Sequence, residues 1–442
     1  MPDDSVFVKH PPGFRARRGL NWAFVGLLYT SFYMCRYNLS IANSSIAGEF
    51  GFTKKQMGEI ITTALIAYAC GQIVNGLLTD RLGGKRAMLI GAAGTIVMNI
   101  LFGVASFWGL LSFFVVIRGI DGYMQAFGAP GMVKINAAWF RHNERGRFAG
   151  IFGFMINLGR FGIFKIGPAL LAGFSFLGLI QIPPLHWRWL FWIPAGIAIV
   201  IGTCMAFVVK DTPEEVNFPT VNPDEEVGGK VQASVLDVLK TIVTNPVIWI
   251  IALAYACTGS VRQGIDQWFP RFMQEVHHVD YQSAQFQFLG FLIPFVASVG
   301  SLASGYISDT IFGGRRAPVA AGLYFLETII ILAAAQFHSV NAAIVFLVLI
   351  SLTANATHSI LGTAAAMDIG GAKMAGFASG LIDSFQYFGG SLAGIFLGAF
   401  LDRSWGWYFY FMTPFGLIGG TLMLSILGRV TLAKPRADSA VR

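Results

Sequence analysis

Twelve predominantly apolar stretches of about 20 residues recur along this chain, and they restrict its fold more than any other feature. Hydrophobic residues make up 55% of the sequence and charged residues only 12%, a composition too apolar for a soluble globule. A membrane barrel would instead show segments of about ten residues with alternating polarity. The sequence therefore predicts an all-α polytopic membrane protein with 12 transmembrane helices.

The predicted spans form two groups of six, separated by a polar linker. They cover residues 20–44, 57–78, 87–106, 108–130, 148–175 and 187–209, then 246–269, 286–308, 317–337, 341–366, 374–401 and 406–428. The linker is acidic in its middle and contains Pro213, Pro219 and Pro223, which interrupt regular structure. We expect an N-terminal tail (1–19), a first bundle (20–209), the linker (210–245), a second bundle (246–428) and a C-terminal tail (429–442).

The net charge of +8 reflects membrane topology. Most lysines and arginines fall in loops that an even number of crossings places on one side, and such loops are cytoplasmic. Both termini are therefore expected in the cytoplasm, with the first span retained and no nucleic-acid partner. The four cysteines lie in apolar spans without paired-ligand spacing, so no disulfide, metal site or cofactor is expected. The sequence also lacks a nucleophile and base pair and a phosphate-binding glycine loop, so we do not expect an enzyme.

Two arginines, Arg36 and Arg262, lie deep in the first and seventh predicted spans. Their separation, 262 minus 36, is 226 residues, close to half of the 442-residue chain. An arginine at the centre of a membrane helix costs roughly 2.5 to 3.5 kcal/mol on insertion scales, so two at matching places need a shared reason. A divalent anion bound between them would provide it. For Arg262 there is an alternative, because Asp266 lies four residues further on and can neutralise it as a structural ion pair.

Other polar side chains accompany Arg36. Tyr29 and Tyr33 lie seven and three residues before it, so they share its helix face, and Tyr68 and Gln72 share a face of the second span. A guanidinium group binds two oxygens of a phosphate or carboxylate, and phenol hydroxyls can bond the remaining oxygens. This set is typical of a polar anion site. The alternative is that the tyrosines are packing aromatics with satisfied hydroxyls.

A second pair of matching segments follows the second and eighth spans. Residues 76–86 read GLLTDRLGGKR and residues 305–316 read GYISDTIFGGRR, at an offset, 305 minus 76, of 229. Two markers in the same order and at similar spacing indicate duplicated six-helix bundles. The first segment resembles the signature loop of the major facilitator superfamily, with Asp80, Arg81 and Asp309 as gating residues. This resemblance implies two pseudo-symmetric bundles with a substrate site near the middle of the membrane.

Within that superfamily, the chain resembles the organophosphate:phosphate antiporters, which include glycerol-phosphate and hexose-phosphate transporters and related sensors. The segments that carry this resemblance are residues 33–38, 67–72, 139–146, 211–213, 262–268 and 385–390. The resemblance implies that Arg36 and Arg262 bind the phosphoryl group from opposite bundles. It also places Tyr29, Tyr33, Tyr68 and Tyr387 among the tyrosines of the cavity.

The chain departs from that family at several positions. It has Gln72 where a lysine is common on the second span, and Ile156 before Asn157 where a histidine is common on the fifth. It also has Tyr37 and Gln267 at positions where family members have lysine and aspartate, a change that removes one charge of each sign. Loss of the lysine and the histidine makes the cavity less cationic and leaves the substrate open.

Arg160 and Lys165 on the fifth span can replace this positive charge. Arg160 lies four residues after Ile156 and so faces the same way, which places it with Gln72 and Asn157 among the predicted substrate contacts. Alternatively, these cations form structural bridges, because buried charges are usually paired. The carboxylates available in other spans are Asp121, Glu327 and Asp383.

Three further features of the spans carry smaller predictions. Arg118 and Asp121 are spaced as a local pair on the fourth span, and His358 is expected to be a hydrogen-bonded packing residue rather than a proton shuttle. Gly390, Gly394 and Gly398 form a ridge of small residues that permits close helix packing.

These observations predict a secondary transporter that exchanges a small organophosphate for inorganic phosphate by alternating access. We expect a monomer in a bacterial inner membrane, with a small anionic metabolite, inorganic phosphate and the lipid bilayer as its partners. Two alternatives stay open. One is a proton-coupled organic anion symporter that uses Asp121, Asp266 or Asp383 as its proton carrier. The other is a membrane sensor that binds a sugar phosphate without transporting it.

Overall fold

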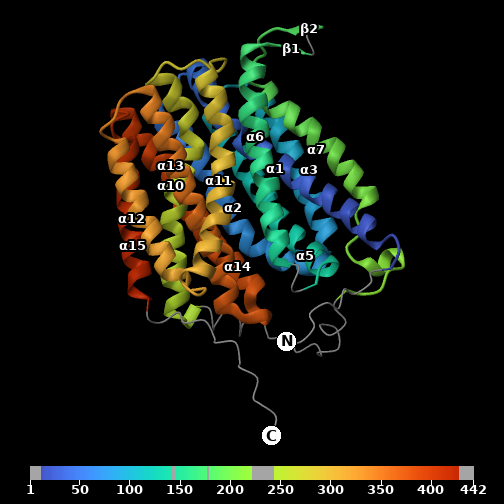
Figure 1. Cartoon of the computed structure of the whole chain (residues 1–442). Coiled ribbons are helices and arrows are strands. Elements are labelled where there is room, and N and C mark those ends of the chain that lie inside the picture. Colours follow the sequence, from blue (N-terminus) through green and yellow to red (C-terminus); the bar gives the residue numbers. More distant parts are fainter. Residues whose placement is uncertain (1–10, 142–144, 177–178, 222–242, 428–442) are drawn as a thin grey trace.

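Two helical bundles lie side by side in the computed structural model, which describes residues 11–141, 145–176, 179–221 and 243–427 (Figure 1). The first bundle contains α1 (Phe14–Phe50), α2 (Lys54–Leu82), α3 (Gly84–Ala105), α4 (Leu111–Gln125), α5 (Gly128–Trp139), α6 (Arg145–Ala172) and α7 (Trp189–Val208). The second contains α10 (Pro246–Glu275), α11 (Ala284–Thr310), α12 (Arg316–Ala334), α13 (Val340–Ser359), η3 (Ile360–Ala365), α14 (Ala366–Arg403) and α15 (Trp407–Ser425). The short elements are β1 (Phe174–Phe176), β2 (Ile180–Ile182) and η2 (Pro213–Val216).

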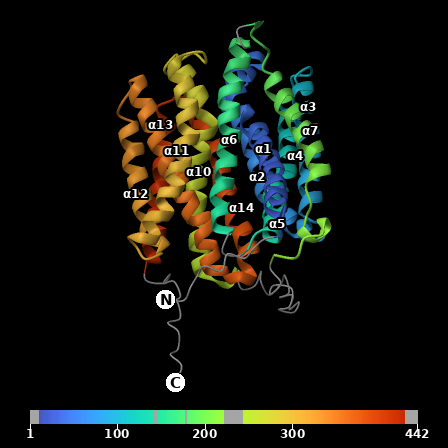
Figure 2. The same cartoon turned by 45° about the vertical axis from the view of Figure 1, so that its right-hand side comes forward.

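The long helices run roughly parallel to one direction, so the molecule has two end faces (Figure 2). We call the face at which α1 begins and α2 ends the first face; it is lower in Figure 1. The second face is the one at which α1 ends and α2 begins, and it carries the antiparallel hairpin of β1 and β2. The sequence patterns predict no such hairpin.

The predicted twelve-helix fold is confirmed, with shifted boundaries. The fourth predicted span, 108–130, is wrong as a single helix: the chain turns at Ala126 and Phe127, between α4 and α5. Pro130 lacks the N–H that would bond the carbonyl oxygen of Ala126 four residues earlier, so a continuous helix is interrupted there. The predicted break at residues 367–373 is also wrong, because α13 continues through the π-helical turn η3 into α14.

Among the described residues, eight helices are long and apolar enough to cross a membrane by length and composition alone. The helices α1 and α10 are not among them, because the polar residues around Arg36 and Arg262 lower their mean hydropathy. Helix α1 begins at Phe14, within the predicted tail 1–19. Most of the predicted linker (222–242) and the C-terminal tail (429–442) lie outside the described residues.

The bundles meet through a reciprocal set of helix pairs. Helix α2 packs against α14, α6 packs against α11, and α1 packs against α10. The second span of one bundle thus meets the fifth span of the other, and the reverse also holds. Such a reciprocal interface is expected of two similar units related by a twofold axis. The arrangement agrees with the duplication read from the sequence.

Small residues bring α2 and α14 into close contact. A Cβ atom at Gly394 would overlap Thr62 and the backbone of Gly58, and one at Gly398 would overlap the backbone of Lys54. Gly390 faces α10 instead, where Gln263 fills the space beside it. The predicted glycine ridge is therefore confirmed as a packing surface, with Gly394 and Gly398 between the two bundles and Gly390 within the second bundle.

Candidate functional site

Ser40 on α1 and Asp266 on α10 mark the axis that relates the bundles. The hydroxyl of Ser40 donates to the backbone oxygen of Asp266 at 2.9 Å, and these residues are 226 positions apart. Equivalent residues of two repeats can touch only near the axis that relates the repeats. Arg36 and Arg262 share this offset, and each precedes the contact by four residues, about one helical turn. The structure therefore places the two arginines on opposite sides of one central axis.

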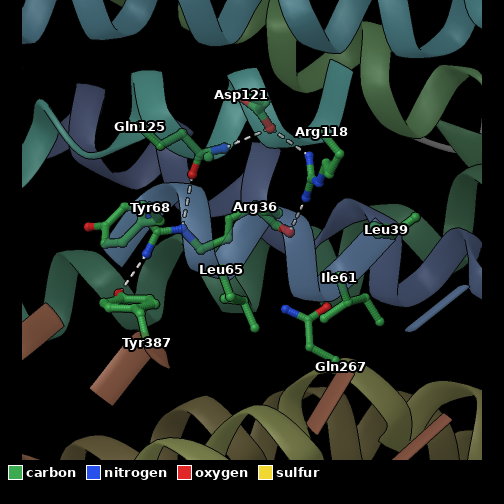
Figure 3. Close-up of a pocket in the computed structure, with 12 residues that line it drawn as sticks. Arg36, Leu39, Ile61, Leu65, Tyr68, Arg118, Asp121, Gln125, Gln267 and Tyr387 are labelled. Atoms are coloured by element: carbon green, nitrogen blue, oxygen red, sulfur yellow. Dashed lines mark hydrogen bonds and ion pairs between the residues drawn. The ribbon is translucent and has the colours of Figure 1, made fainter. Parts of the chain in front are cut away.

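Three tyrosine rings surround Arg36. Hydrogen bonds hold two of its nitrogens, and Figure 3 shows them together with the rings of Tyr68 and Tyr387. Its guanidinium carbon lies 4.6, 4.2 and 5.7 Å from the ring centres of Tyr33, Tyr68 and Tyr387, respectively. Nε donates to Gln125 and Nη1 donates to the hydroxyl of Tyr387, each at 2.9 Å. Nη2 is buried and has no hydrogen-bond partner among the described residues. Because a buried charged donor without an acceptor is costly, this nitrogen is available to an anion oxygen.

A chain of polar contacts on α4 supports Arg36 from behind. Asp121 accepts hydrogen bonds from Gln125 at 3.0 Å and from Arg118 at 2.7 Å. Arg118 also donates to the backbone oxygens of Cys35 and Arg36. The predicted local pair of Arg118 and Asp121 is thus confirmed, and it orients Gln125, which in turn fixes the Nε side of Arg36 (Figure 3).

Arg262 is held by fewer partners. Its Nε donates to Oδ1 of Asn355 on α13 at 3.1 Å, and the amide of Asn355 donates in turn to the backbone oxygen of Ser351 at 2.7 Å. Asp266 lies 4.0 Å from Arg262, at the limit for an ion pair. The structural ion pair of Arg262 with Asp266, which the sequence left open as an alternative, is therefore only a weak contact.

Arg160 of the first bundle is the main partner of Asp266. The two fully buried side chains form an ion pair across the bundle interface, and the hydroxyl of Tyr37 donates to the same carboxylate at 3.2 Å. Because both charges are buried, removal of either partner would leave an uncompensated charge and would destabilise the interface. Asp266 therefore joins α1, α6 and α10 next to the axis.

Two sequence predictions for α6 are corrected here. Arg160 does pair with a carboxylate, but not with one of the three predicted candidates Asp121, Glu327 and Asp383. Lys165 donates to the amide oxygen of Gln287 on α11 at 3.1 Å, and no carboxylate of the described chain pairs with it. The predicted structural bridge of Lys165 is therefore wrong. Sequence spacing could not reveal either partner, because both lie on helices of the other bundle.

The other predicted contacts lie near this interface. Asn157 accepts from Arg160 at 3.1 Å and donates to Ser298 of α11 at 2.8 Å, so it links the bundles. Tyr29 is buried, and its ring centre lies 5.4 Å from that of Tyr33. Tyr29 therefore extends the aromatic wall beside Arg36 along α1 toward the first face.

Asp383 on α14 lies within the electrostatic range of both arginines. The positive charges of Arg262 and Arg36 act on its carboxylate. Gln72 donates to Asp383 at 3.1 Å and to the hydroxyl of Tyr68 at 2.9 Å. The two bundles thus share one polar cluster in which a carboxylate accompanies the two cations.

Tyr255 and His358 continue this cluster into the second bundle. The hydroxyl of Tyr255 lies 3.4 Å from Oδ1 of Asp383 and 2.5 Å from Nδ1 of His358. The predicted hydrogen-bonded histidine is confirmed, and its partner leads to Asp383.

The space beside Arg36 is small in this conformation. A cavity of about 20 Å³ is lined by residues of both bundles, among them Arg36, Tyr68, Gln125, Gln267 and Tyr387 (Figure 3). One water molecule needs roughly 10 to 15 Å³ by this measure, so the cavity holds a water but not a phosphate ester. An anion can enter only if the helices around Arg36 move apart.

The two signature loops lie at the first face and form ion pairs within their own bundles. Lys134 lies 3.7 Å from the carboxylate of Asp80 and donates to the backbone oxygen of the same residue at 2.7 Å. Asp309 lies 2.8 Å from Arg316, and Arg81 is exposed at the end of α2. The three predicted gating residues are therefore exposed at the first face, at the ends of α2 and α11 that lie opposite the second face.

At the second face, charged residues fasten the bundles to each other. Lys54 at the start of α2 lies 3.1 Å from Glu275 at the end of α10. Glu275 also accepts from Arg271 at 2.5 Å and from the indole of Trp405 at 2.9 Å. Asp402 of α14 accepts from the backbone N–H of Lys54 at 2.7 Å, which caps α2 from the other bundle. We call these five residues the second-face clasp.

Sequence reasoning missed several residues of the site, and one signal was available. Tyr255 precedes Arg262 by seven residues, as Tyr29 precedes Arg36, so the repeat itself points to it. Gln125 lies four residues after Asp121, so helical spacing places it on the same face as the expected pair of Arg118 and Asp121. The second-face clasp gives no such signal beyond the i, i+4 spacing of Arg271 and Glu275, because its other members come from distant helix ends.

Two bundles of six spans each, related by an axis that passes between buried arginines, define a multi-pass membrane transport protein rather than an enzyme. Residues 25–394 match the sequence model of the Major Facilitator Superfamily, and the chain belongs to that family. The predicted superfamily is confirmed by this match.

Its relatives include proteins of the predicted antiporter group. The chain is 28% identical over 404 residues to a probable hexose phosphate transport protein of Chlamydia trachomatis serovar D, covering 87% of this chain and 85% of the relative. It is 28% identical to the glycerol-3-phosphate transporter of Bacillus subtilis, covering 86% of each chain. It is also 27% identical to the membrane sensor protein UhpC of Escherichia coli, covering 93% and 92%.

Solved structures show the same fold. A bacterial homologue of the human lysosomal transporter Spinster, in an inward-facing and occupied conformation, superposes with a TM-score of 0.73 at 16% identity. The superposition covers 96% of this chain and 98% of that one. The unoccupied inward-facing structure of the same homologue gives a TM-score of 0.68 at 17% identity.

Proposed function

We propose that this protein is a secondary transporter that exchanges a small organophosphate, such as a sugar phosphate or glycerol phosphate, for inorganic phosphate. The observation that carries this proposal is the placement of Arg36 and Arg262 on either side of the axis, one from each bundle. A phosphoryl group bound by both would draw the bundles together. The relatives support this substrate class, since their names specify hexose phosphate and glycerol-3-phosphate.

The chemistry of the cluster fits a phosphoryl group. The free Nη2 of Arg36 and the forked guanidinium of Arg262 each offer charge-assisted hydrogen bonds to phosphate oxygens. The hydroxyls of Tyr68 and Tyr387 lie beside Arg36 and would bond the remaining oxygens. Arg160 contributes less, because Asp266 already neutralises it.

The first face is proposed to be cytoplasmic, in a bacterial inner membrane. Lysines and arginines are concentrated in the loops and tails of that side of the chain, as the positive-inside rule requires. The second-face clasp then closes the site from the outside, and transport requires the clasp to open while the first face closes. Alternating access of this kind is a rocking of the two bundles about the central site.

Exchange of labelled phosphate in proteoliposomes tests the proposal. Arg36→Lys keeps the charge but loses the fork that binds two oxygens, so exchange is expected to fall at least about tenfold. Arg15→Lys is the matched control, because Arg15 is exposed at the first face and lies outside the cluster and both signature loops. Unchanged exchange by Arg36→Lys would overturn the site. Phosphate binding by the native protein without any counterflow would indicate a sensor, which is the role named for one relative.

A further inference from the structure

Asp383 raises a question of charge in the anion site, because it faces the two arginines that the proposed function assigns to the substrate. Arg262 and Arg36 act on its carboxylate, and Gln72 donates to it at 3.1 Å. Asp383 forms no direct ion pair with either arginine among the described residues, but its negative charge offsets part of their positive charge when no anion is bound. A phosphate that enters must therefore compete with a negative charge that is already there.

The formal charges around the axis can be added up for the site with and without phosphate. Three guanidinium groups belong to Arg36, Arg160 and Arg262, and two carboxylates belong to Asp266 and Asp383. The cluster thus carries one excess positive charge when all five are ionised. A doubly charged phosphate would leave one excess negative charge, whereas the same phosphate with one proton on Asp383 leaves none. In a site of low dielectric constant the neutral combination is strongly favoured.

A path for that proton is visible. His358, which is partly exposed, lies 2.5 Å from the hydroxyl of Tyr255, and this hydroxyl lies 3.4 Å from Oδ1 of Asp383. The proton on Nδ1 of a neutral His358 can pass to the tyrosine oxygen while the tyrosine's own proton passes to Asp383 and a proton from solvent binds at Nε2 of His358. Tyr255 and His358 are both neutral before and after this step, and Asp383 becomes a neutral acid.

We propose that Asp383 takes up one proton when a doubly charged phosphate binds between Arg36 and Arg262, so that substrate and proton move together. This inference rests on the proposed function. It makes Asp383 a proton-binding residue of the site and assigns Tyr255 and His358 to the proton path, a role for His358 that goes beyond the packing role predicted from the sequence. Exchange of phosphate for an organophosphate then carries a proton in each direction and stays electrically balanced.

The charged and titratable groups that face Asp383 come from every helix around it. They are Arg36 and Tyr29 of α1, Tyr68 of α2, Tyr255 and Arg262 of α10, His358 of α13 and Tyr387 of α14 itself, while Arg160 of α6 acts on His358. The tyrosines stay neutral in the physiological range, so the carboxyl group of Asp383 is the group of this set that binds the proton.

Calorimetry of phosphate binding tests the inference. Purified full-length protein is titrated with inorganic phosphate in buffers of different ionisation enthalpy, at an alkaline pH where phosphate is doubly charged. The native protein is expected to take up about one proton for each phosphate bound. Asp383→Asn should bind phosphate with no proton uptake and about tenfold more tightly, because the competing charge is gone. Glu327→Gln is the control, since Glu327 is a fully buried carboxylate on α12 that acts on Cys257 and Tyr324 rather than on the arginines.

The outcomes separate the two proposals. If the native protein binds phosphate without proton uptake, the inference is overturned and the proposed function stands. This outcome can be recognised without any variant. Proton uptake that persists in Asp383→Asn also overturns it, because the proton then resides on the phosphate or elsewhere. Absence of phosphate binding by the native protein overturns the proposed function and the inference with it. Proton uptake by the native protein and by Asp383→Glu, lost in Asp383→Asn, supports the inference.

Discussion

Arg36 is fixed on one side and free on the other, and this asymmetry suits a ligand-binding cation. Gln125 holds Nε, and the rings of Tyr33 and Tyr68 hold the guanidinium plane between them. These contacts fix the orientation of the unpartnered Nη2 before any ligand binds. Preorganisation of this kind lowers the ordering cost of binding, because the side chain needs no further restriction when the anion arrives.

Gln125→Leu tests the importance of this support. Loss of the acceptor leaves Nε of Arg36 buried and unpaired, which costs about 1 to 3 kcal/mol and frees the guanidinium to seek another partner. We expect phosphate exchange in proteoliposomes to show a KM about tenfold higher, with a smaller change in maximal rate. Gln336→Leu, at an exposed glutamine of the second bundle, is the control. A normal KM for Gln125→Leu would show that the tyrosine rings alone orient Arg36.

At the scale of helices, the contact of α2 with α14 determines how closely the bundles approach. Gly394 leaves space that Thr62 and the backbone of Gly58 occupy, so even one added methyl group would push the helices apart. Close backbone approach through small residues is a common way for membrane helices to associate. The same contact carries Tyr387 and Asp383 of α14 toward the central cluster.

Gly394→Ala and Gly380→Ala form a matched pair on α14. An alanine normally stabilises a helix by up to about 1 kcal/mol relative to glycine, and no atom lies within 4 Å of a Cβ at Gly380. Thermal unfolding in detergent should therefore show an unchanged or slightly raised Tm for Gly380→Ala and a Tm several degrees lower for Gly394→Ala. Equal shifts in the two variants would contradict a tight contact of α2 with α14.

The helices themselves could be predicted from the sequence far better than their partners. Apolar length alone predicts the spans, and the 226-residue offset of Arg36 and Arg262 predicts that they face each other. The break at Pro130 follows a missing hydrogen bond that a hydropathy pattern does not detect. The partner of Arg160 and the second-face clasp depend on how two bundles dock, and side chains brought together by docking have no fixed spacing along the chain.

At the scale of the whole molecule, the second-face clasp is what holds the bundles in the observed conformation. Lys54 and Asp402 connect α2 with the second bundle, and Arg271 donates to Asn43 of α1 at 2.8 Å. Glu275 is the centre of the clasp, because Arg271, Trp405 and Lys54 all reach its carboxylate. An alternating-access protein must break these contacts once in every cycle.

Protonation of Glu275 should therefore open the second face. Glu275 lies beyond the apolar part of α10; burial opposes its ionisation, but the bonds from Arg271, Trp405 and Lys54 outweigh burial and hold the pKa of the carboxyl group below its ordinary value. The clasp thus stabilises the closed form above the ordinary glutamate pKa of about 4.3, and this stabilisation is lost as pH falls through the lowered pKa.

Spin labels can report this opening. They are attached at Lys55→Cys and Ala284→Cys in a protein from which the four native cysteines have been removed. Both positions are exposed at the second face, on α2 and α11, so double electron–electron resonance between the labels measures the distance between the bundles. We expect the native clasp to give short distances at neutral pH and longer ones only in acid, whereas Glu275→Gln gives the longer distances already at neutral pH. Glu59→Gln, one turn further along α2, should leave the distances unchanged. Short distances in Glu275→Gln would mean that glycine packing between α2 and α14 holds the second face closed by itself.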